Sequence, residues 1–355
     1  MRKTIPVSVL LLLVGALMAQ AQGFIPEKDK QEREAEEMRL ARKLLESKDS
    51  HERVKIRDEM IEKDVIRNAG GQALGNGFSV KAFVWLYGEG KDDRSKDLNA
   101  RLHAVIGLAF IDSAAARLPL ITTLEDPNDA IQLRAIQAIS RRSIVRAGKD
   151  VVLKLRSPNP EVVAAAAKCL TDLGVTEGST GTMIELMVQW YAKLLKAADD
   201  DPERVDHHRM IEVLGRACGQ LTGVKWSPGP SIEDLGAEIA KLTRWWNQQH
   251  LTGLKDPRHE VRKDALDRMS VTADRSVFMP VLEAVVKEFT RLQATGNFTE
   301  KQQAQQFIVV ASGMLQQVSG VGAVLRPTST TQEIEAAVKQ WQEWAKAHMT
   351  ALANP

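Results

Sequence analysis

The segment from 199 to 210, DDDPERVDHHRM, contains the densest group of residues able to bind a metal, with Asp206, His207 and His208 in succession. Carboxylate and imidazole groups are common zinc ligands. Neighbouring residues of a helix point about 100° apart, so the two histidines cannot bind one ion without further ligands. Acidic residues also stabilise the positive end of a helix. We expect this second role, and we predict no catalytic residue, no metal site and no cofactor.

Tryptophan is the other residue type here that often marks a binding surface. Helix-spaced aromatic residues more often form the core, and they can be separated by angle. Leu235, Ile239, Leu242 and Trp246 fall on one stripe, which we predict to be buried. Trp245 lies beside this stripe, about 80° away, and so does its counterpart in the second copy, Trp344. The candidates for partner contact are Trp245, Trp344 and Trp226, and packing against the adjacent repeat is the alternative that we favour for the first two.

Other signatures of chemistry are absent from the sequence. It has no GxSxG, HExxH or CxxC motif, and the glycines near residue 75 lack the Lys-Ser/Thr pair of a phosphate-binding loop. The stretch Asn68 to Gly77, NAGGQALGNG, is predicted to be a loop and the best hinge or linker candidate. Cys169 and Cys218 lie in apolar helical patterns, which favours two buried free thiols; a disulfide is the alternative.

Residues 1–21 have the three parts of a cleavable secretory signal. A basic MRK is followed by the apolar IPVSVLLLLVGALM and by AQA, which ends at Ala21. An uncleaved anchor would need about 18 or more apolar residues. We therefore expect cleavage after Ala21, secretion to the periplasm or the extracellular space, and no integral membrane segment afterwards.

Charge argues against nucleic-acid binding. The chain has 48 basic and 46 acidic residues, and loss of residues 1–21 with Arg2 and Lys3 would balance the two. Nucleic-acid binding proteins carry a basic excess that neutralises phosphates. The composition, with only 5% aromatic residues and two tyrosines, favours helices over sandwiches or barrels.

The chain contains an internal duplication. Residues 153–250 align with residues 252–349 at offsets of 97 to 99, and the length change falls in a proline-containing loop. A shorter motif recurs as LEDPNDAIQLRAIQAI from Leu124, LRSPNPEVVAAAAKCL from Leu155 and LKDPRHEVRKDALDRM from Leu254, with a weaker version from Leu45. Each version predicts an antiparallel helix pair in which Asp or Ser caps the second helix and Pro lies in its first turn.

The turn DPxxEVRxxA, with Asp256, Pro257, Val261, Arg262 and Ala265, resembles the HEAT-like repeat family. A partial match uses Asp126, Pro127, Ile131, Arg134 and Ala135. The resemblance implies an all-α fold, a right-handed α-solenoid of antiparallel helix pairs, because one pair cannot bury its apolar face alone. The family is known mainly for scaffolding and binding, so it implies no catalytic residues.

The predicted organisation follows from these patterns. After the signal come a charged helical cap with a glycine-rich linker (22–78), HEAT-like helix pairs (79–152) and two four-helix copies (153–250 and 252–349). We expect an exported, non-enzymatic scaffold whose groove binds a protein or peptide in the cell envelope; the oligomeric state stays open. The alternative is an envelope enzyme of helical-toroid type, a glycan lyase or a metal-dependent hydrolase, that uses Asp206, His207 or His208.

Overall fold

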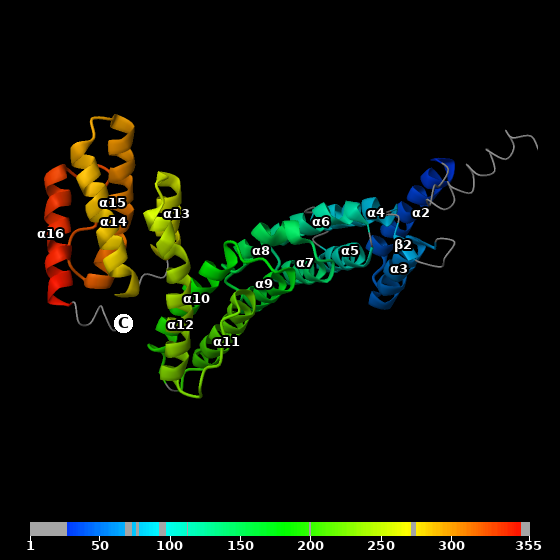
Figure 1. Cartoon of the computed structure of the whole chain (residues 1–355). Coiled ribbons are helices and arrows are strands. Elements are labelled where there is room, and N and C mark those ends of the chain that lie inside the picture. Colours follow the sequence, from blue (N-terminus) through cyan, green and yellow to red (C-terminus); the bar gives the residue numbers. More distant parts are fainter. Residues whose placement is uncertain are drawn as a thin grey trace, which may run out of the picture. The chain divides into compact units, whose positions relative to one another are not determined.

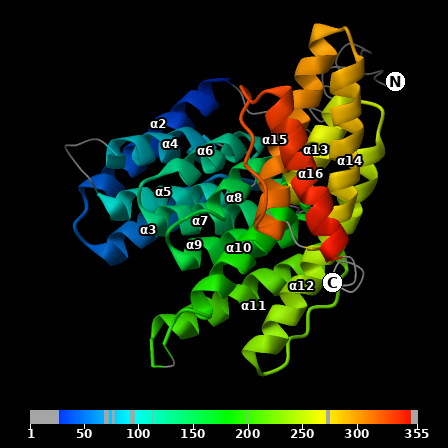
Figure 2. The same cartoon turned by 90° about the vertical axis from the view of Figure 1, so that its left-hand side faces the viewer.

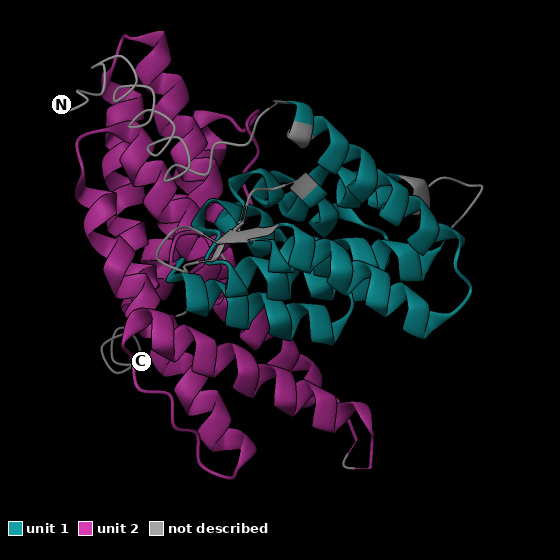
Figure 3. Cartoon of the chain, turned by 90° about the vertical axis from the view of Figure 1, so that its right-hand side faces the viewer, with its two compact units in different colours: residues 1–175 teal, residues 176–355 magenta. Residues whose placement is uncertain are grey.

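The fold is described from a computed structural model, which covers residues 27–67, 73–75, 78–91, 97–111, 113–198, 200–270 and 275–348. Residues 1–21, the predicted signal, lie outside the described residues. Two compact units divide the chain, residues 1–175 and 176–355 (Figure 3). The boundary falls inside the predicted copy 153–250, because its first helix packs on the two helices before it.

The first unit is built from paired helices with one short hairpin (Figure 1). Helix α2 packs on α3 and α4, α4 packs on α5, and α5, α7 and α9 follow one another as neighbours. The α4, α6 and α8 helices therefore lie along one side of this unit, and α5, α7 and α9 along the other (Figure 1). The helices are α2 (Glu27–Glu46), α3 (Ser50–Lys63), α4 (Phe78–Lys91), α5 (Leu98–Phe110), α6 (Arg117–Thr122), α7 (Asp129–Arg141), α8 (Gly148–Lys154) and α9 (Pro160–Leu173), with 3-10 turns η1 (Ala114–Ala116), η2 (Thr123–Glu125) and η3 (Val145–Ala147).

The glycine-rich stretch is the one place where the first unit departs from an all-helical prediction. Strands β1 (Val65–Arg67) and β2 (Ala73–Gly75) pair antiparallel, with Ile66 opposite Leu74. The three described residues of the predicted linker, Ala73 to Gly75, thus form a strand instead of a loop, whereas residues 68–72 and 76–77 lie outside the described part. The β-branched residues of β1 favour an extended backbone, which explains why this segment does not continue α3.

The second unit consists of two packed layers of helices. The first layer contains α10 (Ser179–Leu194), α12 (Ile232–Leu251), α14 (Arg275–Ala294) and α16 (Thr331–Ala347), each packed on the next. The second contains α11 (Glu203–Thr222), α13 (His259–Ser270) and α15 (Phe298–Ser319), and η4 (Thr252–Lys255) leads into α13. Figure 2 shows α14 and α16 side by side. This stacking of helix pairs is that of an α-solenoid.

Matching helix ends appear in the two aligned halves. Ser231 at the start of α12 and Thr330 at the start of α16 each form a capping box with the residue three positions later, Asp234 and Glu333 respectively. Gly223 and Gly320, which end α11 and α15, both have a positive φ, 74° and 72°. A side chain at φ > 0 is strained, so glycine suits these ends. The duplication therefore extends to individual hydrogen bonds.

The predicted capping by Asp or Ser of the repeated motif is wrong by two residues. The side chains of Asp126 and Ser157 accept the backbone N–H of Asn128 and Asn159, at 2.9 and 3.2 Å. It is Asn128 and Asn159 that cap α7 and α9. The Asp or Ser side chain thus forms a local turn that leads into the helix. Short polar side chains can form either such a turn or a helix cap, and here they form the turn.

One residue of the proposed family match is also out of register. Arg134 is exposed and hydrogen-bonds to Gln137, so it does not correspond to Arg262. The Arg262 guanidinium donates 2.9 Å to the backbone oxygen of Asp256, six residues earlier. Gln132 donates 2.7 Å to the oxygen of Asp126 with the same spacing. Gln132 therefore takes the structural place of the arginine, because an amide can make the same bond.

The predicted core stripe is confirmed. Leu235, Ile239, Leu242 and Trp246 are all buried. Within the described ranges, no helix is both long and apolar enough to span a lipid bilayer.

Candidate functional site

The Asp206, His207 and His208 side chains do not converge in the structure. Asp206 is exposed in the first turn of α11, as expected for a residue that stabilises a helix start. His207 is buried, with its ring edge-on to Trp190 at 5.1 Å between centroids. His208 lies 4.0 Å from Glu212. Among the described residues, no three His, Cys, Asp or Glu side chains gather closely enough to hold a metal ion.

The three candidate tryptophans are half-buried and lie in different surroundings. Trp344 packs against the core at Phe278, 4.6 Å between centroids, and stacks on His348. Trp245 is half-buried on the flank of α12. Trp226 lies over Gly215, where a Cβ atom would collide with the indole. The structure does not bring the three together into one surface.

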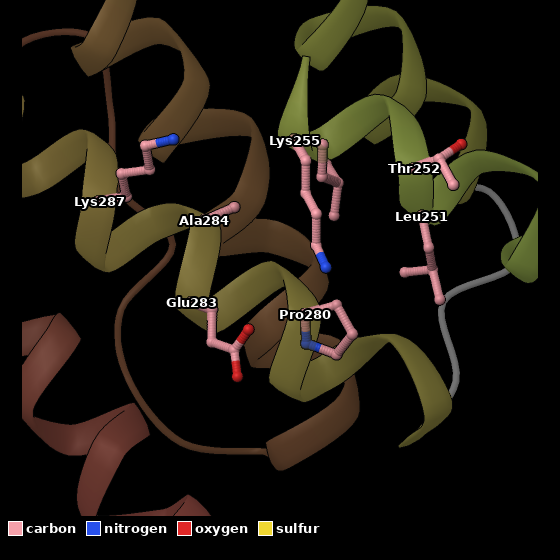
Figure 4. A pocket seen from close by; sticks show the side chains of 8 residues that line it. Leu251, Thr252, Lys255, Pro280, Glu283, Ala284 and Lys287 are labelled. Atoms are coloured by element: carbon pink, nitrogen blue, oxygen red, sulfur yellow. The ribbon is translucent and has the colours of Figure 1, made fainter. Parts of the chain in front are cut away.

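A pocket of about 330 Å³ lies between the end of α12 and α14 (Figure 4). Its walls are mostly apolar, and its lining side chains come from η4 and α14 as well. In Figure 4, Lys255 extends from η4 toward Pro280 of α14. We call this pocket the α12–α14 groove; it is lined by Leu251, Thr252, Leu254, Lys255, Pro280, Glu283, Ala284 and Lys287.

A second pocket, of about 440 Å³, lies on the other flank of α14, against α16. Its floor is apolar and its rim carries an amide and two charges. We call it the α14–α16 groove; it is lined by Met279, Leu282, Glu283, Val286, Gln342, Ala345 and Lys346. Glu283 lines both grooves, so the two form a continuous surface across α14. Both volumes fall within the range of about 300–1,000 Å³ typical of ligand pockets.

The charged groups at the two grooves have no ionic partner among the described residues. Lys255, Lys287 and Lys346 take part in no salt bridge there, and neither does Glu283. Lys241 and Lys263 of the same unit do form salt bridges, with Glu238 at 2.8 Å and with Asp267 at 3.3 Å. The surface across α14 therefore combines apolar hollows with a net positive rim.

No sequence motif indicated these grooves, because their lining residues do not form a catalytic or metal-binding pattern. The available signal was a break in the duplication. Met279 and Ala345 line the α14–α16 groove, and at the offsets of 98 and 99 they occupy the positions of Gly181 and Trp246 in the first copy. Side-chain volume thus moves from the α16 position, where alanine replaces tryptophan, to the α14 position, where methionine replaces glycine.

Cys169 and Cys218 are buried free thiols, as predicted. Burial raises the pKa of each thiol to about 12. A thiol that holds its proton is a poor nucleophile. Neither cysteine therefore has the character of a catalytic or redox-active group.

Comparisons with known proteins gave no family by sequence. No protein-family model matches the chain, and no curated protein matches it significantly. Solved structures are similar at low identity: the CpcE–CpcF complex of phycocyanin lyase from Nostoc sp. PCC7120 is 13% identical, with a TM-score of 0.33, and covers 85% of this chain and 93% of that one. Human deoxyhypusine hydroxylase, solved with glycerol, is 14% identical, with a TM-score of 0.29, and the match covers 76% of this chain and 96% of that one.

An engineered protein is also similar, at 17% identity and a TM-score of 0.30, with 86% of this chain and 77% of that one covered. These matches carry no argument about activity or partners. The assignment to helical-repeat proteins rests on the paired helices and the duplicated caps described above.

Proposed function

We propose that the chain is an exported HEAT-like scaffold without catalytic activity, which binds a protein or peptide partner in the cell envelope. The observation that carries this proposal is the surface across α14, where two apolar grooves share Glu283 and are lined by lysines that form no salt bridge with the described residues. Apolar hollows with a polar rim are typical of interaction sites. Solenoids commonly present such extended surfaces to partners.

The alternative of an envelope enzyme gains no support from the geometry. It would use Asp206, His207 or His208, of which the first is exposed, the second is buried beside Trp190, and the third faces Glu212. A general acid or base must lie within hydrogen-bond reach of its substrate. His207 is closed off from such contact by its own helix packing.

Site-specific photo-crosslinking in intact cells tests the proposal. A photoreactive residue at position 283, between the two grooves, should give an adduct of defined mass, and reversal of charge by Lys287→Glu and Lys346→Glu should reduce its yield. Glu335, exposed on α16 and outside both grooves, provides the matched control position. Equal adducts at 283 and 335, insensitive to the charge reversals, would contradict a scaffold that binds through this surface.

Export is tested by the new amino terminus. Protein recovered from the envelope fraction or the medium should begin at Gln22 when sequenced from its end. Replacing Ala19 and Ala21 by bulky residues should block cleavage, because the peptidase requires small side chains at these places. Recovery of the protein only from the cytosol, with Met1 retained, would overturn this part of the proposal.

A further inference from the structure

Two neighbouring repeats of the first unit hold apolar side chains out into the solvent. Leu118 of α6 is 61% exposed, and Val145 of η3 and Leu153 of α8 are 59% and 69% exposed. Val145, Lys149 and Leu153 are spaced four residues apart, so they lie on one side of the η3–α8 segment. In consecutive copies of the short repeated motif, Leu118 aligns with Lys149 and Thr122 with Leu153. The two helices therefore present the same side to the solvent.

Helices α6 and α8 follow each other along one side of the first unit, in both Figure 1 and Figure 2. The η2 turn, which continues α6, contacts α8. Arg142, just before η3, holds the two repeats together, because its guanidinium donates to the backbone oxygens of Leu108 and Ser113 at 3.1 and 2.9 Å. The solvent-facing sides of α6 and η3–α8 thus form one surface. We call it the α6–α8 face; its residues are Arg117, Leu118, Thr122, Val145, Arg146, Lys149, Leu153 and Lys154.

This face is basic in a chain whose charges nearly balance. The segment 141–156 contains six basic residues and a single acidic one, Asp150, whereas the whole chain has 48 basic and 46 acidic residues. Elsewhere in the unit exposed lysines are paired, as Lys168 is with Asp172 at 2.8 Å. The cations of the α6–α8 face form no salt bridge with the described residues; they are Arg117, Arg146, Lys149 and Lys154.

We propose that the α6–α8 face binds the surface of a membrane that contains anionic phospholipids. Leu118, Val145 and Leu153 enter the boundary between headgroups and acyl chains, and the four cations lie against the lipid phosphates. Basic helices that turn apolar side chains toward a bilayer bind membranes in this way, without spanning them. Lysine and arginine suit this place, because their aliphatic stems stay beside apolar groups while their charges reach the headgroups.

The composition of the face favours a bilayer over other anionic partners. Protein interfaces are enriched in aromatic residues and depleted in lysine. Residues 114–125 and 145–156 contain no aromatic residue and two lysines. A nucleic acid would neutralise the cations through its phosphates, but its backbone offers no apolar interior for exposed leucine and valine side chains. Only an anionic bilayer satisfies the charges and the protruding apolar groups together.

Co-sedimentation with lipid vesicles provides the first test. The apolar segment 5–18 would itself bind lipid, so the protein is used in the form that begins at Gln22, which keeps every described residue. Vesicles of phosphatidylcholine with about 30% phosphatidylglycerol should bind it at least about tenfold more tightly than vesicles of phosphatidylcholine alone. High salt should remove most of this difference, because exposed charges are screened. Equal binding to the two kinds of vesicle would overturn the proposal.

Neutral substitutions test the cations one by one. Arg146→Gln and Lys149→Gln should each weaken binding to the anionic vesicles about fivefold, the contribution of one basic residue near an anionic surface. Lys339→Gln is the matched control, since Lys339 is also exposed and without a salt bridge but lies on α16. If the three substitutions had the same effect, binding would follow total charge, and the α6–α8 face would not be the site.

Substitutions of the apolar residues test insertion into the bilayer. Leu153→Ser should weaken binding about threefold to tenfold with the charge unchanged, because leucine gains free energy on leaving water. Leu195→Ser is the matched control, since Leu195 is 60% exposed at the end of α10. Undiminished binding of Leu153→Ser would contradict the insertion of this side chain.

A dye at the same position reports its surroundings directly. Leu153→Cys can be labelled selectively with a nitrobenzoxadiazole dye, because Cys169 and Cys218 are buried. Its emission should shift to the blue and brighten on anionic vesicles, whereas the same dye at Leu195→Cys should not change. Salt-sensitive binding without this shift would mean that the face touches charged groups only, and would overturn the bilayer proposal.

The same position distinguishes a membrane from a protein in intact cells. With a photoreactive residue at position 153, we expect no protein adduct of defined mass, and we expect Arg146→Gln with Lys149→Gln to release the chain from the membrane fraction. One strong protein adduct at 153 would identify a protein partner instead and overturn the proposal. The α14 surface is tested separately by the adducts at position 283, so either result leaves the proposed scaffold function standing.

Discussion

The carboxyl group of Glu37 is fully buried on α2, and its oxygens receive no hydrogen bond from the described residues. The nearby hydroxyl of Ser79 donates to the backbone oxygen of Met60 instead. Burial, with a smaller contribution from the Asp64 carboxylate, raises the pKa of Glu37 from 4.5 to about 7, and this outweighs the lowering by the nearby Ser79 hydroxyl and by the charges of Arg33 and Lys63. An ionised carboxylate that is buried and accepts no hydrogen bond destabilises the folded state, so the protonated form is favoured.

This environment adds to the stability a contribution that falls as pH rises. Between pH 4.5 and about 7 the folded chain keeps the Glu37 proton and the unfolded chain has lost it, so the Glu37 contribution to the free energy of unfolding decreases through this window by about 3 kcal/mol and is then flat. His103 contributes in the opposite direction, because burial lowers its pKa to about 4 and the unfolded chain then binds the proton first. Glu37→Gln should therefore make the free energy of unfolding rise more, or fall less, between pH 5 and pH 8 than it does in the parent. Urea unfolding of both proteins at pH 5 and pH 8 measures it.

Glu36 supplies a control of opposite sign. Arg39 and Lys63 lower the pKa of this exposed carboxyl to about 2, so its contribution is present above pH 4.5 and lost in acid. Glu36→Gln should leave the difference between pH 5 and pH 8 intact. A Glu37→Gln protein with the same pH dependence as the parent would refute the assignment.

Burial of both cysteines predicts that their thiols react slowly with disulfide reagents. With a pKa near 12, the Cys169 and Cys218 thiols should react with a disulfide reagent at pH 8 only when the fold opens. We expect no reaction in the native protein and two equivalents of thiol in denaturant. Rapid native labelling of either residue would show that its helix opens locally or that its burial is wrong.

At the scale of elements, a buried ion pair joins α13 to α14 in the second copy only. Arg262 lies 2.9 Å from Glu288, and both side chains are less than a tenth exposed. The same guanidinium donates to the backbone oxygens of Asp256 and Pro257 and so fixes the turn before α13. At the aligned positions the first copy has Val163 and Trp190, which need no partner charge.

Removal of both partners should therefore cost less than the two single removals added together. Glu288→Gln leaves a buried guanidinium without its carboxylate and should cost about 3–5 kcal/mol of unfolding free energy. Arg262→Met combined with Glu288→Leu should cost less than the sum of the single changes. The measurement is a double-mutant cycle by urea unfolding. Additive costs would mean that the pair contributes no coupling.

The sequence predicted these elements well where periodicity decides and poorly where single side chains decide. The stripe through Leu242 and Trp246 followed from spacing alone, because burial repeats with the turn of the helix. The cap at Asn128 and the hydrogen bond from Gln132 did not follow from spacing. The side chain of Asp126 could either cap α7 or form the turn before it, and the sequence pattern is the same in both cases. The α14–α16 groove was missed because its lining residues form no sequence motif.

At the scale of the molecule, the two compact units should respond to damage separately. Phe83 is fully buried in the first unit, and Phe307 belongs to a buried apolar cluster of the second. In repeat arrays each element contacts only its neighbours, so stability is a sum of local terms. Truncation of a buried phenylalanine costs about 3–5 kcal/mol where it occurs.

Hydrogen exchange followed by mass spectrometry tests this separation. Phe307→Ala should lower the protection of α14 and α15 amides by two or more orders of magnitude, since 1.4 kcal/mol is a factor of ten, while the amides of α5 and α7 stay as protected as in the parent. Phe83→Ala is the matched change in the first unit and should give the reverse pattern. If either substitution lowered protection equally in both units, the chain would unfold as one cooperative body, and the additive description of its repeats would not hold.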